Sequence, residues 1–228
     1  TNGAYAVIKP GTHILRIRYW VKDVVTGTEG TITKDLTSAN YESNKLYNIT
    51  ANLDVRDYDG DHYYMWDAKE QYWAGHGWQS ADPWQPVLNG NYNLNFPKEF
   101  TDLRFWRRGG LNRFDATQSC AGLLNANEMS WYVMYGDPRW DADELWTTMG
   151  RLYKGGMWFK KKSVLVAEGY YDTEKSADRT TDLRESSAHY DNNNSSIMSG
   201  VPSVADIGKY FYLPCLGYYN AGQLDGVG

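Results

Sequence analysis

The first 55 residues alternate apolar and polar side chains with the period of two that half-buried strands show. The alternation is clearest in three segments, HILRIRYWV (13–21), TIT (31–33) and KLYNITANLDV (45–55). Glycines and a Ser-Asn pair between these segments are typical of turns. The pattern therefore predicts three strands, and so small a sheet would leave an apolar face and open edges without cover.

A helical period follows later, within residues 123–159. Asn127 is placed to cap a short helix through its side-chain oxygen, and Glu128 falls in the first turn, where the helix dipole favours an anion. Gly136 is expected to end the helix in a left-handed conformation. The spacing thus predicts a first helix of about two turns.

A second helix is predicted after the break at Asp137-Pro138, because apolar residues recur there at helical spacing. The recurring residues are Leu145, Trp146, Met149, Leu152 and Tyr153, and the acidic residues expected near its start are Asp141, Asp143 and Glu144. Gly155-Gly156 would end this helix, and Met157–Phe159 would begin a strand. Since large apolar side chains at helical spacing usually bury one another, these residues are expected in the core rather than around a cofactor.

The acidic segment DVRDYDGD (54–61) is expected to be a linker. Asp57, Asp59 and Asp61 have the one-three-five spacing of a calcium loop. However, His62 and Ala68 stand where that loop needs glycine and glutamate. The segment therefore favours a solvated turn over a calcium site.

Two proline-, glycine- or polar-rich stretches, 79–117 and 169–203, are expected to be long surface loops. Within or beside them, several charged or polar groups have a plain structural interpretation. His76 stands alone among aromatic residues and is expected to be hydrogen-bonded rather than a metal ligand. For Arg104, Arg107 and Arg108, ordinary ion pairing is favoured over binding of an acidic sugar. The basic run at 160–162 is expected to be a solvated strand end.

Composition narrows the classes of function. Aromatic residues make up 15% of the chain, with 19 tyrosines and 10 tryptophans, which is typical of surfaces that recognise sugars or proteins through flat amphipathic rings, although a tyrosine-rich β core explains part of it. A net charge of −5 without a basic stripe argues against nucleic-acid binding. No apolar run approaches the length of a membrane span, so membrane association would require an anchor outside this chain.

Two segments carry a family resemblance. NEMSWY (127–132) resembles the "TEAEWEYA"-type segment of formylglycine-generating-enzyme-like domains, which have a C-type-lectin-like fold, and LPCLGYY (213–219) resembles their "LPxxGYR" segment. Most of residues 63–228, including YYMWDAKEQYWAGH and DPRWDADELWTTMG, is also similar to surface proteins of Gram-negative gut anaerobes. In those proteins a fimbrillin-like β-sandwich precedes such a lectin-like domain.

The resemblance implies an α+β fold in three parts. Residues 1–55 would be the C-terminal strands of a fimbrillin-like β-sandwich, 56–62 a linker, and 63–228 a C-type-lectin-like domain. It further implies that the rest of the sandwich is absent from this sequence or supplied by a partner. The closing strand of the lectin-like fold would follow residue 228.

The tyrosine-rich end of the chain, residues 209–228, is the candidate binding face, because tyrosine offers large contact area at low rotamer entropy and Asn and Gly adapt hydrogen bonding. The candidate ligand-binding residues are Tyr210, Tyr212, Tyr218, Tyr219, Asn220, Gln223 and Asp225. Some lectin-like proteins of this type look like targets of diversity-generating retroelements, which change Asn codons to Tyr, Asp or Ser. This segment fits that substitution set, although tyrosine-rich loops also occur without it.

The favoured function is a non-catalytic adhesin or minor fimbrial subunit at the cell surface, in the outer membrane or on a fimbrium. It would bind a glycan or protein ligand and contact neighbouring fimbrial subunits. A structural stalk subunit assembled by strand donation is an alternative. A formylglycine-generating-like oxidase is another, but those enzymes need two close cysteines in the C-terminal part, where only Cys215 lies. Cys120 and Cys215 could instead form a disulfide. No catalytic residue, metal or cofactor is predicted.

Overall fold

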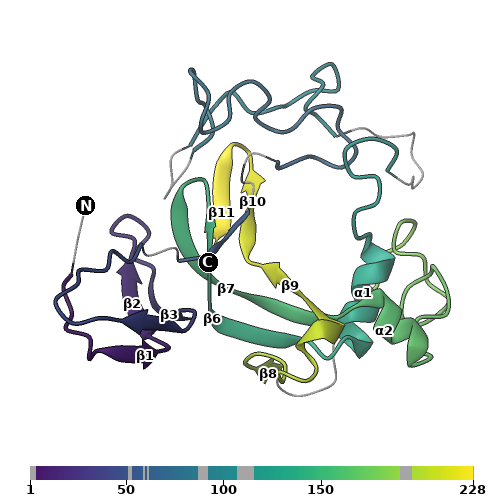
Figure 1. Ribbon diagram of the computed structural model, residues 1–228. Helices are drawn as coiled ribbons and strands as arrows, with labels where there is room; N and C mark the ends of the chain where they lie inside the picture. The colour runs from purple at the N-terminus through teal and green to yellow at the C-terminus, as the bar shows by residue number, and fades with distance from the viewer. Residues whose placement is uncertain are drawn as a thin grey trace.

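The computed structural model of the chain describes residues 4–50, 53–58, 60, 62–86, 92–106, 116–190 and 197–227. The fold is β-rich, with 10% of residues in helices and 30% in strands. Figure 1 shows three regions: an N-terminal group of strands, a central sheet with two helices together at one end, and a layer of irregular chain beyond the sheet.

The central sheet has the strand order β5 (Arg56–Tyr58), β6 (Arg139–Thr148), β7 (Arg151–Lys160) and β9 (Tyr210–Pro214), and β8 (Met198–Ser199) also pairs with β6. Strand β7 runs antiparallel to both β6 and β9. The two short strands β5 and β8 are parallel to β6 at its opposite ends. The prediction of a strand over Met157–Phe159 is confirmed, but its start is wrong, because β7 already begins at Arg151.

The predicted second helix is wrong, because residues 139–160 form the β6–β7 hairpin. Met149 and Gly150 make its turn with positive φ angles of 49° and 67°. The register shifts between Asp141 and Leu145, so a bulge interrupts the strand alternation there. The apolar residues that mimic a helical spacing are in fact spread over two strands and a turn.

Helix α1 (Ala126–Tyr135) is present, but its cap differs from the prediction. Asn125, rather than Asn127, accepts the N–H of Glu128, and the Glu128 carboxylate accepts the N–H of Asn125 in return. Gly136 has a φ of −79°, so the expected left-handed stop is also wrong; Asp137 adopts that conformation instead, with φ at +47°.

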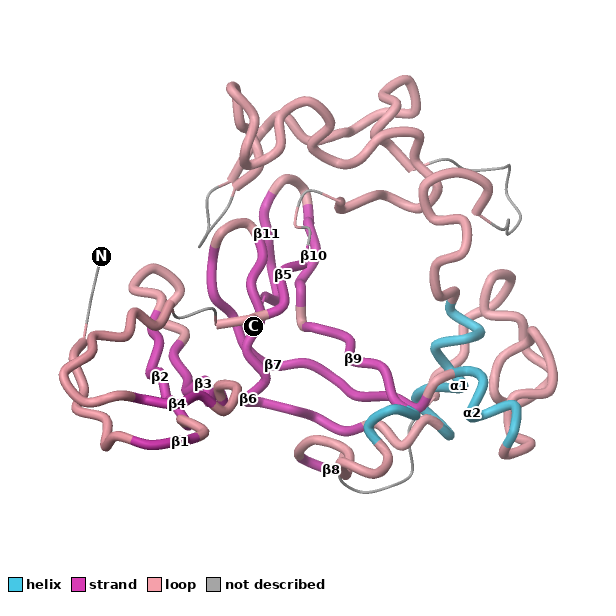
Figure 2. Tube along the Cα trace, in the orientation of Figure 1, coloured by secondary structure: helices cyan, strands magenta, loops and turns pink. Residues whose placement is uncertain are grey.

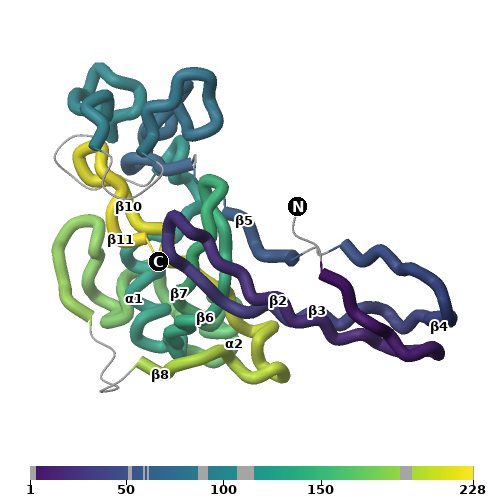
Figure 3. The backbone as a smooth tube through the Cα atoms, turned by 90° about the vertical axis from the view of Figure 1, so that its left-hand side faces the viewer, coloured from purple at the N-terminus to yellow at the C-terminus, as the bar shows by residue number. Residues whose placement is uncertain are grey.

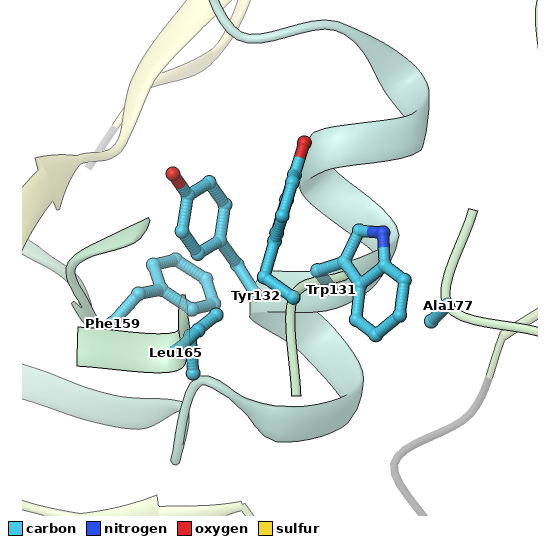
Figure 4. Close-up of a cluster of buried hydrophobic side chains, with 6 residues drawn as sticks. Trp131, Tyr132, Phe159, Leu165 and Ala177 are labelled. Carbon is cyan, nitrogen blue, oxygen red and sulfur yellow. The ribbon is translucent and has the colours of Figure 1, made fainter. Parts of the chain in front are cut away.

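The main core lies where α1 and α2 (Lys162–Ala167) meet the sheet (Figure 4). The buried residues that form it are Trp131, Tyr132, Phe159, Leu165, Tyr171 and Ala177. In the neighbouring hairpin Leu145, Trp146, Met149 and Tyr153 are buried as well. The expectation that these aromatic and apolar residues form core is therefore confirmed, although the second group reaches it from strands.

The described residues of 62–124 contain neither helix nor strand, and Figure 2 shows them as one loop layer. The predicted loops at 79–117 are thus confirmed for the described part. His76 Nδ1 donates to the carbonyl of Asp82 at 2.8 Å, and Arg104 forms an ion pair with Asp102 at 2.8 Å. Both residues have the structural roles expected of them, whereas Arg107 and Arg108 lie outside the described residues.

The basic run at the end of β7 is engaged within the protein. Lys160 pairs with Glu168 and Lys162 with Glu128, each at 2.8 Å, and Lys161 donates to the carbonyl of Gly208. These lysines therefore connect the end of β7 to the start of α2, and each has a partner within the protein. The polar stretch 169–203 is mostly loop where it is described, with the short strand β8 near its end.

The N-terminal residues form two separate two-stranded sheets, β2 (Arg16–Lys22) with β3 (Glu29–Asp35) and β1 (Gly11–His13) with β4 (Ala39–Tyr41). Figure 3 shows them extending to one side of the central sheet. The first two predicted strands are confirmed. The third is wrong for the described part of 45–55, and β5 forms just beyond it, inside the expected linker. The division of the chain into domains stays a prediction.

One carboxylate joins the N-terminal strands to the central sheet. Asp23, in the loop after β2, accepts the N–H of Leu152 at 3.1 Å and also the N–H groups of Val25 and Thr26. Burial opposes ionisation of Asp23, but these three hydrogen bonds outweigh it and lower its pKa. The Thr26 hydroxyl donates to the carbonyl of Leu152 at 2.8 Å, which completes a two-way contact with the start of β7.

Candidate functional site

The C-terminal strands β10 (Leu216–Asn220) and β11 (Gln223–Val227) form an antiparallel hairpin that pairs with no other described strand. Its turn, Ala221-Gly222, has positive φ at both residues, 47° and 83°, as a two-residue type I′ turn requires. Figure 1 shows the tip of the hairpin pointing toward the loop layer. The hairpin is thus an element of its own, separate from the central sheet.

Four of the candidate binding residues share the exposed face of this hairpin. Tyr218 is directly opposite Asp225, and Asn220 is directly opposite Gln223. All four are exposed, and the Tyr218 side chain remains 56% accessible. Because strand residues two apart point to the same side, the four side chains form one surface, here called the display face.

The display face offers one aromatic ring, one carboxylate and two carboxamides. The Tyr218 hydroxyl is 3.5 Å from Oδ2 of Asp225, and Oδ1 of Asp225 accepts the N–H of Gly226 at 2.8 Å. The carboxylate is therefore held beside the ring. Together the four side chains can stack on a flat or apolar ligand surface and can both donate and accept hydrogen bonds.

Tyr219 faces the opposite way and does not belong to the display face. Its ring lies against Tyr63, Tyr72 and Trp73, with centroid separations of 4.8, 5.4 and 5.4 Å. Its hydroxyl donates to the carbonyl of Pro86 at 3.2 Å, and burial raises its pKa. Tyr219 is an internal anchor of the hairpin rather than a residue available to a ligand.

Tyr210 and Tyr212 also lie apart from the display face, on β9 of the central sheet. Tyr210 is buried, and its hydroxyl donates to Asp137 at 2.6 Å; burial and this carboxylate raise its pKa to about 12. Tyr212 lies against Gly156, and a Cβ at that glycine would come 2.5 Å from the Tyr212 hydroxyl. The structure therefore brings together four of the seven candidate residues and places the other three inside.

The inner face of the hairpin is held by residues that the sequence did not single out for the site. The N–H of Gly222 donates to the Tyr72 hydroxyl at 3.0 Å, and its carbonyl accepts the N–H of Asn93 at 3.2 Å. At the base of β10, the Tyr63 hydroxyl donates to the carbonyl of Leu216 at 2.7 Å. The only local signal for these contacts is the aromatic density of YYMWDAKEQYW (63–73).

The two cysteines are both free, so the disulfide alternative is wrong. Cys120 is buried within the loop layer, where its sulfur accepts the N–H of Asp67 at 3.4 Å. Within the described ranges, no three His, Cys, Asp or Glu side chains are grouped so as to hold a metal ion. The predicted acidic turn at Asp59 and Asp61 lies outside the described residues.

Comparison with known proteins gave no match to a family model, to a curated protein or to a solved structure. A search of the described residues for a helix long and apolar enough to cross a membrane found none.

Proposed function

We propose that this protein is a non-catalytic cell-surface adhesin that binds a glycan or protein ligand through the display face of the β10–β11 hairpin. The observation that supports this most directly is the separation of roles along β10. Tyr218 and Asn220 face solvent, while Tyr219 between them is anchored among aromatic rings. The side chains available to a ligand thus lie on one face of the hairpin, while its opposite face is fixed by aromatic contacts.

The chemistry of the display face suits recognition. Tyrosine gives a large contact area with few rotatable bonds, and an anchored backbone reduces the entropy lost when a ligand binds. Two strand positions span roughly 7 Å and adjacent strands lie roughly 5 Å apart, so the four side chains match the size of one or two sugar rings. A protein ligand would need further contacts beyond this face, since a stable interface buries about 800 Å² on each partner.

The family resemblance agrees with this proposal and adds its setting. A central sheet, a helix-packed core and long loops are compatible with a C-type-lectin-like domain, which we propose as the fold of residues 63–228. The protein would then act at the cell surface, in the outer membrane or as a tip or minor subunit of a fimbrium. The exposed Tyr218, Asn220 and Asp225 are also the positions at which retroelement-driven diversification would alter binding.

Glycan-array and host-protein binding by the wild-type chain tests the proposal, together with two tyrosine variants. Tyr218→Ala is expected to weaken binding at least tenfold, because it removes the only ring of the display face. Tyr5→Ala is the matched control, since Tyr5 is 95% exposed in the N-terminal segment far along the chain from the hairpin. Absence of binding on both platforms, or equal binding by both variants, would refute the adhesin.

A structural subunit assembled by strand addition is the second candidate, and the N-terminal strands favour it. Among the described residues up to Thr50 only Tyr41 is buried, while Ile14 and Trp20 are 66% and 64% exposed. The β2–β3 sheet pairs with no other described strand, and a groove of about 600 Å³ beside it is lined partly by Val21 and Ile32. An added strand would cover this apolar surface.

Mixing the protein with candidate partner subunits and measuring polymer formation separates the two roles. A stalk subunit forms polymers through both ends, whereas a terminal adhesin accepts a strand and stops growth. No observation in the described part of the chain favours the oxidase alternative. Metal analysis of the purified protein and a Cys215→Ser variant would test it directly.

A further inference from the structure

The hairpin that carries the display face is not stabilised by strand pairing beyond its own two strands. Neither β10 nor β11 pairs with any other described strand. An isolated two-stranded hairpin is marginally stable in water. The orientation of Asn220 and Gln223, which flank the turn, therefore depends on what holds the tip.

The tip is held by backbone contacts at Gly222. This residue is buried, and a side chain there would collide with the loop layer, since a Cβ would come 2.0 Å from the carbonyl oxygen of Asn93. The buried N–H of Gly222 donates to the phenol oxygen of Tyr72 at 3.0 Å. One hydroxyl from the loop layer thus satisfies the amide at the corner of the turn.

Tyr72 is itself fixed from several directions. The side chain is 3% exposed, and its ring stacks on Tyr219 at an interplanar angle of 15° and meets Trp73 edge-on. Its backbone N–H donates to the carbonyl of Tyr63 at 2.7 Å. The hydroxyl therefore has little freedom to follow a moving hairpin, and it acts as a fixed acceptor.

We propose that Tyr72 is a positioning residue for the display face: its hydroxyl holds the Gly222 amide and so sets the orientation of the hairpin tip from which Asn220 and Gln223 project. The inference rests on the proposed binding function for its consequence, but the ordering of the tip can be measured without a ligand. Tyr72 touches no ligand in this scheme. It lowers the entropy that the hairpin would otherwise lose on binding.

The test uses Tyr72→Phe, which removes one oxygen and keeps the ring contacts with Tyr219 and Trp73. Tyr171→Phe is the matched control, because Tyr171 is 6% exposed in the main core and its hydroxyl makes a hydrogen bond at 3.0 Å with Glu174. Hydrogen exchange of the Gly222 amide is expected to accelerate about five- to tenfold in Tyr72→Phe and to stay at the wild-type rate in Tyr171→Phe.

Binding kinetics give the second readout. A less ordered tip destabilises the bound complex but has little effect on the rate at which protein and ligand associate. Tyr72→Phe is therefore expected to raise koff about five- to tenfold and to leave kon unchanged. Wild-type exchange at Gly222 in Tyr72→Phe overturns the inference, as does a wild-type koff. If the wild-type protein binds no ligand, the adhesin proposal fails. The exchange rate of Gly222 then decides alone whether Tyr72 orders the tip.

Discussion

Replacing Asn127 with alanine is expected to destabilise the protein by removing a side chain that ties helix α1 to the loop after α2. The Asn127 amide donates to the carbonyl of Glu174 at 3.0 Å and to the Asp182 carboxylate at 3.1 Å, and its oxygen accepts the N–H of Leu183 at 2.8 Å. Asn127 is 0% exposed, so these hydrogen bonds take the place of those that its side chain would make with water in the unfolded chain. Replacing it would remove one hydrogen-bond partner from the Glu174 carbonyl, from the Asp182 carboxylate and from the Leu183 amide.

The cost follows from the number of hydrogen bonds. Each is worth about 1 kcal/mol net, so the free energy of unfolding should fall by about 3 kcal/mol. In a domain of this size that lowers Tm by roughly 6–12 °C. Asn125→Ala removes only the cap of α1, which is worth about 1 kcal/mol.

Thermal and urea unfolding of both variants, followed by circular dichroism, measures the difference. Asn127→Ala is expected to lower the free energy of unfolding about three times as much as Asn125→Ala. An equal or larger loss at Asn125 would refute it, because that ranking would mean that the bonds to Glu174, Asp182 and Leu183 contribute little.

Three other changes test separate parts of the fold. Ala221→Gly is expected to raise the free energy of urea unfolding by about 1 kcal/mol, because Ala221 holds a φ of +47°, where a Cβ is disfavoured. Partial desolvation and the neighbouring Asp141 raise the pKa of Glu144, so this group opposes folding once it ionises, and stability is lost as pH rises through the folded-state pKa. Glu144→Gln should therefore raise Tm at pH 7 but not at pH 3. Asp23→Ala should accelerate limited proteolysis within residues 4–50 and leave the rest unchanged, since its bond to Leu152 is lost.

Each of these changes has an outcome that contradicts it. A less stable Ala221→Gly would mean that the added freedom of the unfolded chain outweighs the relieved strain. The same Tm gain for Glu144→Gln at both pH values would exclude a raised pKa as its cause. Unchanged cleavage of Asp23→Ala would show that the N-terminal strands do not depend on that carboxylate.

Residues 139–160 form two strands that the sequence pattern did not predict, because a bulge and the burial of adjacent side chains obscure the alternation of apolar and polar residues. The Asp141 carboxylate accepts the N–H groups of Asp143 and Glu144, which holds the bulge and resets the alternation. Leu145 and Trp146 are then both buried although they are adjacent. A spacing rule that assumes one buried face therefore predicts a helix where the chain forms such a hairpin.

The cap of α1, by contrast, could have been predicted. A capping box needs a glutamate three residues after the cap, and counting back from Glu128 gives Asn125 rather than Asn127. The role of Asn127 could not be predicted in this way. Its partners Glu174, Asp182 and Leu183 lie about fifty residues further along the chain.

The sequence could indicate which segment contains the candidate site, but it could not indicate which side chains of that segment share one surface. Composition indicated the tyrosine-rich end, and the four exposed residues of the display face were among those named. Assigning Tyr219 to the inside requires knowing that Tyr63 and Tyr72 lie behind it, and those residues are distant in sequence. Tyr210 was grouped with the hairpin only because it is close along the chain, although it belongs to β9.

The strict inward and outward alternation of β10 has a consequence for how this end of the protein can evolve. Substitutions at positions 218, 220, 223 and 225 leave the aromatic contacts of Tyr219 intact, so these four side chains can change with little loss of stability. Inserting or deleting a single residue before Tyr219 would turn that ring to solvent and force a polar group inward. Related chains should therefore differ widely in the chemistry of these four positions while keeping the length of both strands constant.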